Sequence, residues 1–407
     1  MWQPMRTRSF RRFFVAGIVS NAGSWMQSIA VPFAVFEITN SKTWLGITAF
    51  TGMFVAMIAN TPGGMLADRY PRRVVLAVTQ AIQMMSAIAL WALWSFGRPS
   101  IATMMPLLII GSIGGGLNMP AWQSFIPSLV PPSEISAAIR LNSMQFAAAR
   151  AIGPVLGTVT LKTLGASSCF MINAISYLVI IGVLAVAPDD SRLWSSVGRS
   201  GLRKALSEVA DGWRYLAGHP TLRYAPTASL VNAAFGFGLT TLAPALAKEQ
   251  FGHRSSDNGL LITAFGIGGV LGVSLVGIFA RRTRNSLQVR WAYVAWVAAY
   301  VVLLATGEFA FGMIAFAIAG CANSVGATAL NTALQLQVDD QYRGRVLGAY
   351  MQMFFLGAAT GSLLLAVIAD LTSLRIATGF AAAVFVVFHA WSVIRFDRLR
   401  MLDASSK

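Results

Sequence analysis

One arginine stands inside a long apolar stretch of the sequence, FAAARAIGPVLG, which covers residues 146–157. The guanidinium of Arg150 keeps its charge, because it does not lose a proton in proteins. Two chemical uses of such a charge are open: binding an anionic ligand group, or pairing with a carboxylate that takes up and releases a proton. In a third, structural interpretation Arg150 binds carbonyl groups at helix ends and holds the fold together.

The residues that follow Arg150 place it on a face of small side chains. In a helix that begins near residue 138, Arg150 lies about 18 Å from the start, which is close to the middle of a bilayer. Gly153, Pro154 and Gly157 follow at i+3, i+4 and i+7, so they share its face. A face of this kind packs closely against another helix and not against lipid.

Uncharged polar and aromatic side chains inside other apolar segments are further candidates for a binding site. They can line a cavity, or they can form hydrogen bonds and ring contacts between helices, and the sequence leaves both readings open. These candidates are Asn21, Trp25, Gln27, Asn118, Gln123, Gln145, Asn232, Phe235, Asn323, Asn331 and Gln352.

Motifs for covalent or nucleotide chemistry are missing from the sequence. Glycine runs at 111–118 and 266–272 resemble a dinucleotide-binding loop, but they follow no strand pattern and lie inside apolar segments. There is no Walker loop, no metal-ligand spacing and no nucleophile–base motif, and the two cysteines form no framework. We therefore expect neither an enzyme nor a bound cofactor.

The composition indicates a membrane protein. Of the 407 residues, 56% are hydrophobic and 11% are charged, whereas soluble domains carry about 25% charged residues. Apolar segments long enough to span a bilayer predict an all-α protein with twelve transmembrane helices. They cover residues 12–37, 46–66, 74–96, 103–124, 138–163, 167–187, 224–247, 258–280, 289–306, 309–334, 346–370 and 375–395.

The basic residues alternate between the gaps that separate these segments. The net charge is +16, and 24 of the 31 basic residues fall in every second gap and at both ends, while six fall in the other gaps. The placement excludes a nucleic-acid surface, which would gather them on one patch. The positive-inside rule predicts both termini in the cytoplasm. We expect a multi-pass protein of a cell (inner) membrane.

The chain is expected to consist of two similar halves. Residues 16–38 align without gaps to 228–250, so that Pro32 matches Pro244 and Glu37 matches Glu249. The predicted domains are 1–188 and 223–407, each with six helices, joined by a cytoplasmic loop at 189–222. Residues 201–217 of that loop have the pattern of an amphipathic helix. Parallel six-helix repeats are typical of one large group of transporters, with the substrate site between the halves.

The loop after the second segment, GGMLADRYPRRVV (63–75), carries a specific pattern. Its spacing resembles the signature loop of the major facilitator superfamily, in which this loop latches the two halves together. The resemblance assigns the latch to Gly64, Asp68, Arg69, Arg72 and Arg73. The second copy of the loop has Arg281 where an aspartate would stand, which argues against a symmetrical latch.

Further pieces resemble one branch of that superfamily, exporters similar to the enterobactin exporter and the macrolide-efflux proteins. The pieces include FRRFFVAGIVSNAGSWMQ at the start, HPTLR at 219–223 and YRGRVLGAYMQ at 342–352. Within this branch, Gly153, Pro154 and Gly157 correspond to an exporter motif that bends helix 5. The family lines its cavity with helices 1, 4, 7 and 10, where most of the polar candidates lie.

The resemblance implies a secondary active exporter of small amphipathic molecules, such as drugs or siderophores. It would work by alternating access, coupled to protons and as a monomer in the lipid bilayer. Glu37, near the outer end of the first segment, is the candidate for proton coupling, although a glutamate there also suits a solvated helix end. An importer or facilitator of a polar solute, and a membrane protein that transports nothing, are the alternatives.

Overall fold

The computed structural model describes residues 2–97, 99–187, 202–219, 222–279, 283–394 and 403, and the regular structure within these ranges is entirely helical. The chain falls into two compact units. Unit 1 consists of Met1–Ile38 and Phe54–Leu206, and unit 2 consists of Thr39–Met53 and Ser207–Lys407. Arg281 and residues 189–201 of the predicted loop at 189–222 lie outside the described residues.

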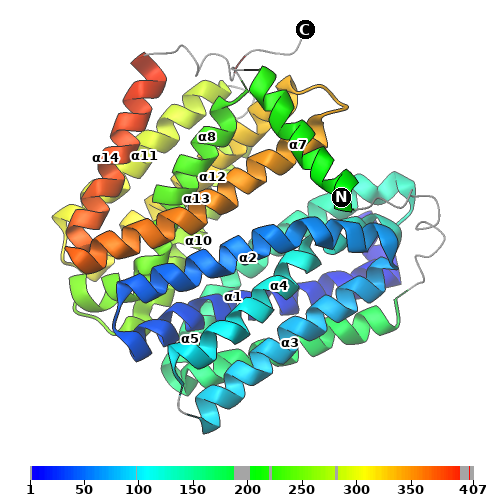
Figure 1. Cartoon of the computed structure of the whole chain (residues 1–407), viewed down its shortest axis with the longest axis horizontal. Coiled ribbons are helices and arrows are strands. Elements are labelled where there is room, and N and C mark those ends of the chain that lie inside the picture. Colours follow the sequence, from blue (N-terminus) through cyan, green and yellow to red (C-terminus); the bar gives the residue numbers. More distant parts are fainter. Residues whose placement is uncertain are drawn as a thin grey trace. The chain divides into compact units, whose positions relative to one another are not determined.

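Unit 1 is built from long helices, of which α3 packs against both α4 and α5 (Figure 1). Short 3-10 turns precede α1 and connect α4 to α5. The helices are α1 (Arg8–Thr39), α2 (Lys42–Arg69, which belongs to this unit from Phe54 on), α3 (Arg72–Phe96), α4 (Ile101–Phe125) and α5 (Ile135–Ala185).

A glycine divides α5 into the two spans that the sequence predicts. Gly165 has φ of 83° and ψ of 174°, a backbone conformation that favours a residue without Cβ. The helix therefore kinks between the predicted spans 138–163 and 167–187.

Aromatic side chains form the core at one end of unit 1. Phe13 of α1 lies 4.6 Å from Trp122 and 5.3 Å from Phe125 of α4, measured between ring centroids. Leu141 and Ile180 of α5 complete this cluster, and neither has any exposed surface. Ring pairs at such distances add to the burial of apolar area, so this cluster fixes the start of α1 against α4 and α5.

Among its described residues, unit 2 contains a broken span followed by five regular helices. The predicted span 224–247 becomes α8, the π-helix η4, the 3-10 helix η5, α9 and the π-helix η6, because Gly236, Gly238 and Pro244 interrupt regular helix. Figure 1 shows α11 running alongside α12 and α14. The described elements are α7 (Leu202–Gly218), α8 (Tyr224–Val231), η4 (Asn232–Gly236), η5 (Phe237–Leu242), α9 (Ala243–Ala245), η6 (Leu246–Gln250), η7 (Ser255–Asp257), α10 (Asn258–Phe279), α11 (Asn285–Ala305), α12 (Phe309–Gln337), α13 (Arg343–Leu371) and α14 (Leu374–Ile394).

Ten helical stretches in the described residues are long and apolar enough to cross a membrane. The kinked α5 counts once, although it holds two of the predicted spans. Helix α1 is not among the ten, and it carries five polar side chains between Ser20 and Ser28. A helical protein with many membrane spans is confirmed, whereas the count of twelve and the side of the termini stay predictions.

Candidate functional site

Arg150 of α5 lies against the ring of Trp25 of α1. The guanidinium carbon of Arg150 is 5.6 Å from the centroid of the indole. At this distance the negative face of the ring attracts the cation, and the attraction grows when water is excluded. Both residues were predicted for the site from their types alone, and the structure brings them together within unit 1.

The small-residue face of α5 is what brings Arg150 to Trp25. A Cβ added at Gly153 would come within 2.3 Å of the Cβ of Trp25, and one added at Gly157 within 3.0 Å of the Cα of Met26. Pro154, between the two glycines, is buried. The predicted packing of this face against another helix is therefore present, and the partner helix is α1.

The other polar candidates of α1 and α5 differ in their hydrogen-bond partners. The amide of Asn21 donates to the carbonyl of Gly17, at 2.9 Å. Gln27 accepts a hydrogen bond from Asn173 at 2.7 Å. Gln145 is 1% exposed, and its Nε2 has no hydrogen-bond acceptor within the described ranges. An unsatisfied buried donor is costly, which makes Gln145 a group that a bound molecule could satisfy.

The two candidates on α4 differ in their surroundings. Asn118 accepts hydrogen bonds from Thr79 at 3.0 Å and from Gln80 at 3.4 Å, both on α3. Gln123 is exposed. Asn118 thus takes part in the contact between α3 and α4.

The candidates in unit 2 lie in four separate places. Asn232 donates to Asn323 across a buried contact of 3.4 Å between η4 and α12. Phe235 packs edge-to-face on Phe380, with 5.9 Å between the ring centroids. The remaining two lie elsewhere: Asn331 accepts from Gln335, and Gln352 accepts from Trp213.

The arginines of the predicted latch bind carbonyl groups at helix ends in unit 1. Arg72 donates to the carbonyl of Ser124 at 3.1 Å, and Arg73 donates to that of Ala187 at 3.2 Å. Asp68 is half-buried and Arg69 is exposed. A Cβ added at Gly64 would only touch Pro120, at 4.0 Å. The loop therefore ties the ends of α4 and α5 together, while its role as a latch stays a prediction.

A charged cluster at the start of α2 was not predicted from the sequence. Asp370 of α13 accepts hydrogen bonds from the backbone N–H groups of Lys42 and Thr43, at 3.2 and 3.1 Å, and from the hydroxyl of Ser41, at 2.7 Å. Lys42 pairs with Glu249 at 3.0 Å and approaches Asp370 at 3.8 Å. A carboxylate at the first N–H groups of a helix satisfies donors that have no partner in the helix.

The amphipathic helix α7 is anchored to the YRGR segment by a second unforeseen cluster. Tyr215 donates to Asp339 at 2.9 Å and stacks on Tyr342, with 4.6 Å between the centroids. Arg345 approaches Asp211 at 3.7 Å. The prediction of a helix at 201–217 is confirmed by Leu202–Gly218. The YRGR motif was the only signal in the sequence, and it did not reveal its partners.

Glu37, the candidate for proton coupling, is exposed in the last turn of α1.

No group of three or more potential metal-ligating side chains occurs in the part of the chain that the structure describes.

Comparison with known families matches the whole chain. The model of a family described as transmembrane secretion effector, a branch of the major facilitator superfamily, matches residues 1–407.

Curated relatives are similar at low identity. The multidrug efflux pump Tap of Mycolicibacterium fortuitum is 23% identical over 408 residues, which cover 96% of each chain. The enterobactin exporter EntS of Citrobacter koseri is 25% identical over 88% of this chain and 84% of its own. The staphyloferrin A transporter of Staphylococcus aureus is 25% identical over 64% of each chain, so the match spans less than two thirds of that relative.

A solved structure shares the fold. A bacterial homologue of the human lysosomal transporter Spinster, in an inward-facing and unoccupied conformation, has a TM-score of 0.75 and 15% sequence identity. The similarity covers 98% of both chains.

Proposed function

The chain belongs to the transmembrane secretion effector family of the major facilitator superfamily, and on this premise we propose that it exports small amphipathic molecules out of the cell. The proposed cargo is a drug-like or siderophore-like compound that carries a negative or electron-rich group. The observation that carries this proposal is the stacking of Arg150 on Trp25 at the packed face of α1 and α5.

This pair offers two kinds of recognition side by side. The guanidinium of Arg150 has five N–H donors in a planar fork, which suits a carboxylate or a phenolate oxygen. The ring of Trp25 offers a flat apolar surface to the rest of the molecule. The buried Nε2 of Gln145, on the same helix as Arg150, adds a neutral hydrogen-bond donor. The printed names of two relatives, an enterobactin exporter and a multidrug efflux pump, agree with such a cargo.

Export would be driven by protons through alternating access of two six-helix halves, 1–188 and 223–407. The twelve spans, the cytoplasmic termini, the loop at 189–222 and the position in the inner membrane of a bacterium are parts of the same proposal. Glu37 is the proposed coupling carboxylate, Asp68 and its arginines are the proposed latch, and the protein would act as a monomer.

Transport in proteoliposomes tests this function. Vesicles with an acidic lumen and a pH-sensitive dye are supplied with a panel of drugs and siderophores, and proton release is recorded after each addition. Release that depends on one class of compound supports proton-coupled export. Uptake of a polar solute that is insensitive to uncouplers would instead support the importer or facilitator. Folded protein without flux of any compound would overturn both.

A further inference from the structure

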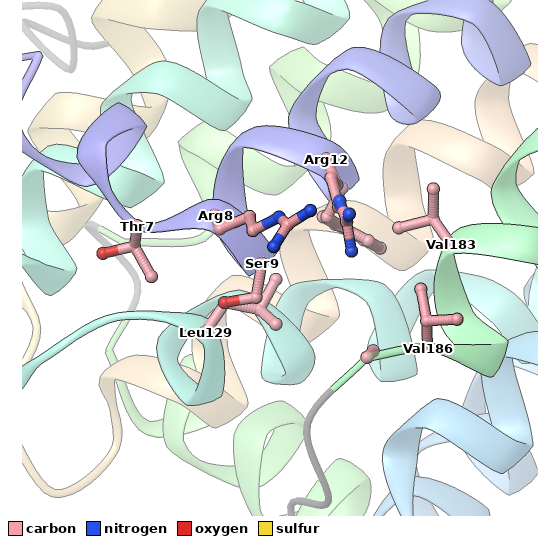
Figure 2. A pocket seen from close by; sticks show the side chains of 9 residues that line it. Thr7, Arg8, Ser9, Arg12, Leu129, Val183 and Val186 are labelled. Atoms are coloured by element: carbon pink, nitrogen blue, oxygen red, sulfur yellow. The ribbon is translucent and has the colours of Figure 1, made fainter.

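A cavity of about 380 Å³ lies between the start of α1 and the far end of α5, within unit 1 (Figure 2). Its lining is divided into a basic, hydroxyl-bearing side and an apolar side. Thr7, Arg8, Ser9 and Arg12 contribute the first side, and Phe13, Leu129, Val183, Val186 and Ala187 contribute the second.

Two arginines enter this cavity from successive turns of one helix. Arg8 and Arg12 are four residues apart and therefore share a face of α1. Figure 2 shows both side chains extending into the same space, with Val183 and Val186 on its other side. No ion pair to either guanidinium is found within the described ranges. Like charges placed together repel each other, so an anion between them would stabilise this arrangement.

The start of α1 itself favours an anion at the same place. The first N–H groups of a helix have no partners within it, and the helix dipole puts partial positive charge there. The first turn of α1, a helix of 32 residues, contains no acidic side chain. The hydroxyls of Thr7 and Ser9 add donors beside it. Phosphate is an anion that helix starts and arginine forks both bind.

We propose that this cavity binds the phosphate group of an anionic phospholipid. The apolar side favours a lipid over a free phosphate as the occupant. Val186 is 65% exposed and offers an apolar surface to the glycerol and the first acyl carbons of a lipid. Helix α5 is long and apolar enough to cross a membrane, so its end is expected where headgroups are found. Basic pockets between transmembrane helices on the cytoplasmic side are suited to anionic headgroups.

Native mass spectrometry of the purified full-length protein tests the site, with phosphatidylglycerol and phosphatidylcholine as probes. We expect one phosphatidylglycerol to bind at least about tenfold more tightly than phosphatidylcholine, and Arg8→Gln/Arg12→Gln to remove this preference. The matched control is Arg6→Gln/Arg11→Gln, which removes the same charge from exposed arginines that do not line the cavity. The control should keep the preference.

Two outcomes would overturn the proposal. Equal loss in both double variants would mean that general surface charge attracts the lipid. Displacement of the lipid by millimolar inorganic phosphate would mean that a free anion is the occupant.

Discussion

Arg150 shows how an aromatic partner lets a permanent charge remain inside a membrane bundle. No carboxylate was available at its depth in the sequence, and the structure places the ring of Trp25 beside it. A cation on an aromatic face is stabilised by about 0.5–2 kcal/mol, depending on how much water is excluded.

Replacing Arg150 should separate transport from folding. We expect Arg150→Gln to abolish export, and Arg150→Lys to reduce it at least about tenfold, because an ammonium lacks the planar fork and stacks less well. Thermal unfolding in detergent should change by only a few degrees. Export is measured in the proteoliposomes described above. Normal export by the Gln variant would contradict a role in transport, and loss of folded protein would indicate a structural role.

Trp25→Leu should weaken export of aromatic cargo more than that of small anions, because it removes the apolar surface and keeps the charge. The control is Trp91→Leu, since the ring of Trp91 contacts Phe96 and belongs to α3. A similar loss of export in both variants would assign the effect to general packing of tryptophan.

At the scale of elements, the glycines of α5 decide how close α1 can approach. Gly153→Ala would force its Cβ to within 2.3 Å of the Cβ of Trp25 and 2.9 Å of the carbonyl oxygen of Ala22. We expect the substitution to lower the free energy of unfolding by about 1–3 kcal/mol. The measurement is tryptophan fluorescence during thermal unfolding.

Gly182→Ala is the matched control on the same helix, because nothing lies within 4 Å of its added Cβ. Alanine is favoured over glycine in helices by up to about 1 kcal/mol, so this variant should be as stable as the wild type or more so. Equal destabilisation of both variants would argue against close packing at Gly153.

The anchor of α7 is a second feature at this scale. Trp213 donates to Gln352 at 3.0 Å and so connects the amphipathic helix to α13. Trp213→Leu should speed hydrogen exchange in 207–218 severalfold, because a lost hydrogen bond costs about 0.5–1.5 kcal/mol. Exchange in α11 serves as the internal reference, and unchanged exchange in α7 would show that other contacts hold it.

At the scale of the whole molecule, α2 belongs to both units. Its residues up to Met53 cluster with unit 2, and those from Phe54 cluster with unit 1. If the two units moved independently, a rigid α2 could not stay packed in both of them. Alternating access would therefore require either a bend in α2 or release of its first turns from Asp370 and Glu249.

Lys42→Met tests how far the ion pairs hold the first turns of α2 in place. The variant removes the pairing with Glu249 and the approach to Asp370. We expect faster hydrogen exchange in residues 39–53, by up to about fivefold, since partly exposed ion pairs contribute about 0–1 kcal/mol. Arg375→Gln, which removes a charge outside this cluster, should leave exchange in 39–53 unchanged. If Lys42→Met also leaves it unchanged, the hydrogen bonds to Asp370 hold the segment without the ion pairs.

The elements of this protein could be predicted well because they depend on local properties. Hydropathy over about 20 residues indicated a helical protein with many membrane spans, and a 3.6-residue period located the amphipathic helix at 202–218. The spacing of Gly64, Asp68 and the arginines indicated the superfamily, which the family match confirms. The irregular backbone of 224–250 was missed, although Gly236, Gly238 and Pro244, which interrupt the helix there, are visible in the sequence.

The sequence by itself determined which residues were exceptional, since a charge or a glycine face within an apolar segment is visible without coordinates. Only the tertiary structure decided what each of them meets. Trp25 and Arg150 are 125 positions apart, and Thr43 and Asp370 are 327 apart. Such pairs form only when helices from distant parts of the chain bury their faces together. No local pattern records which face a helix will meet.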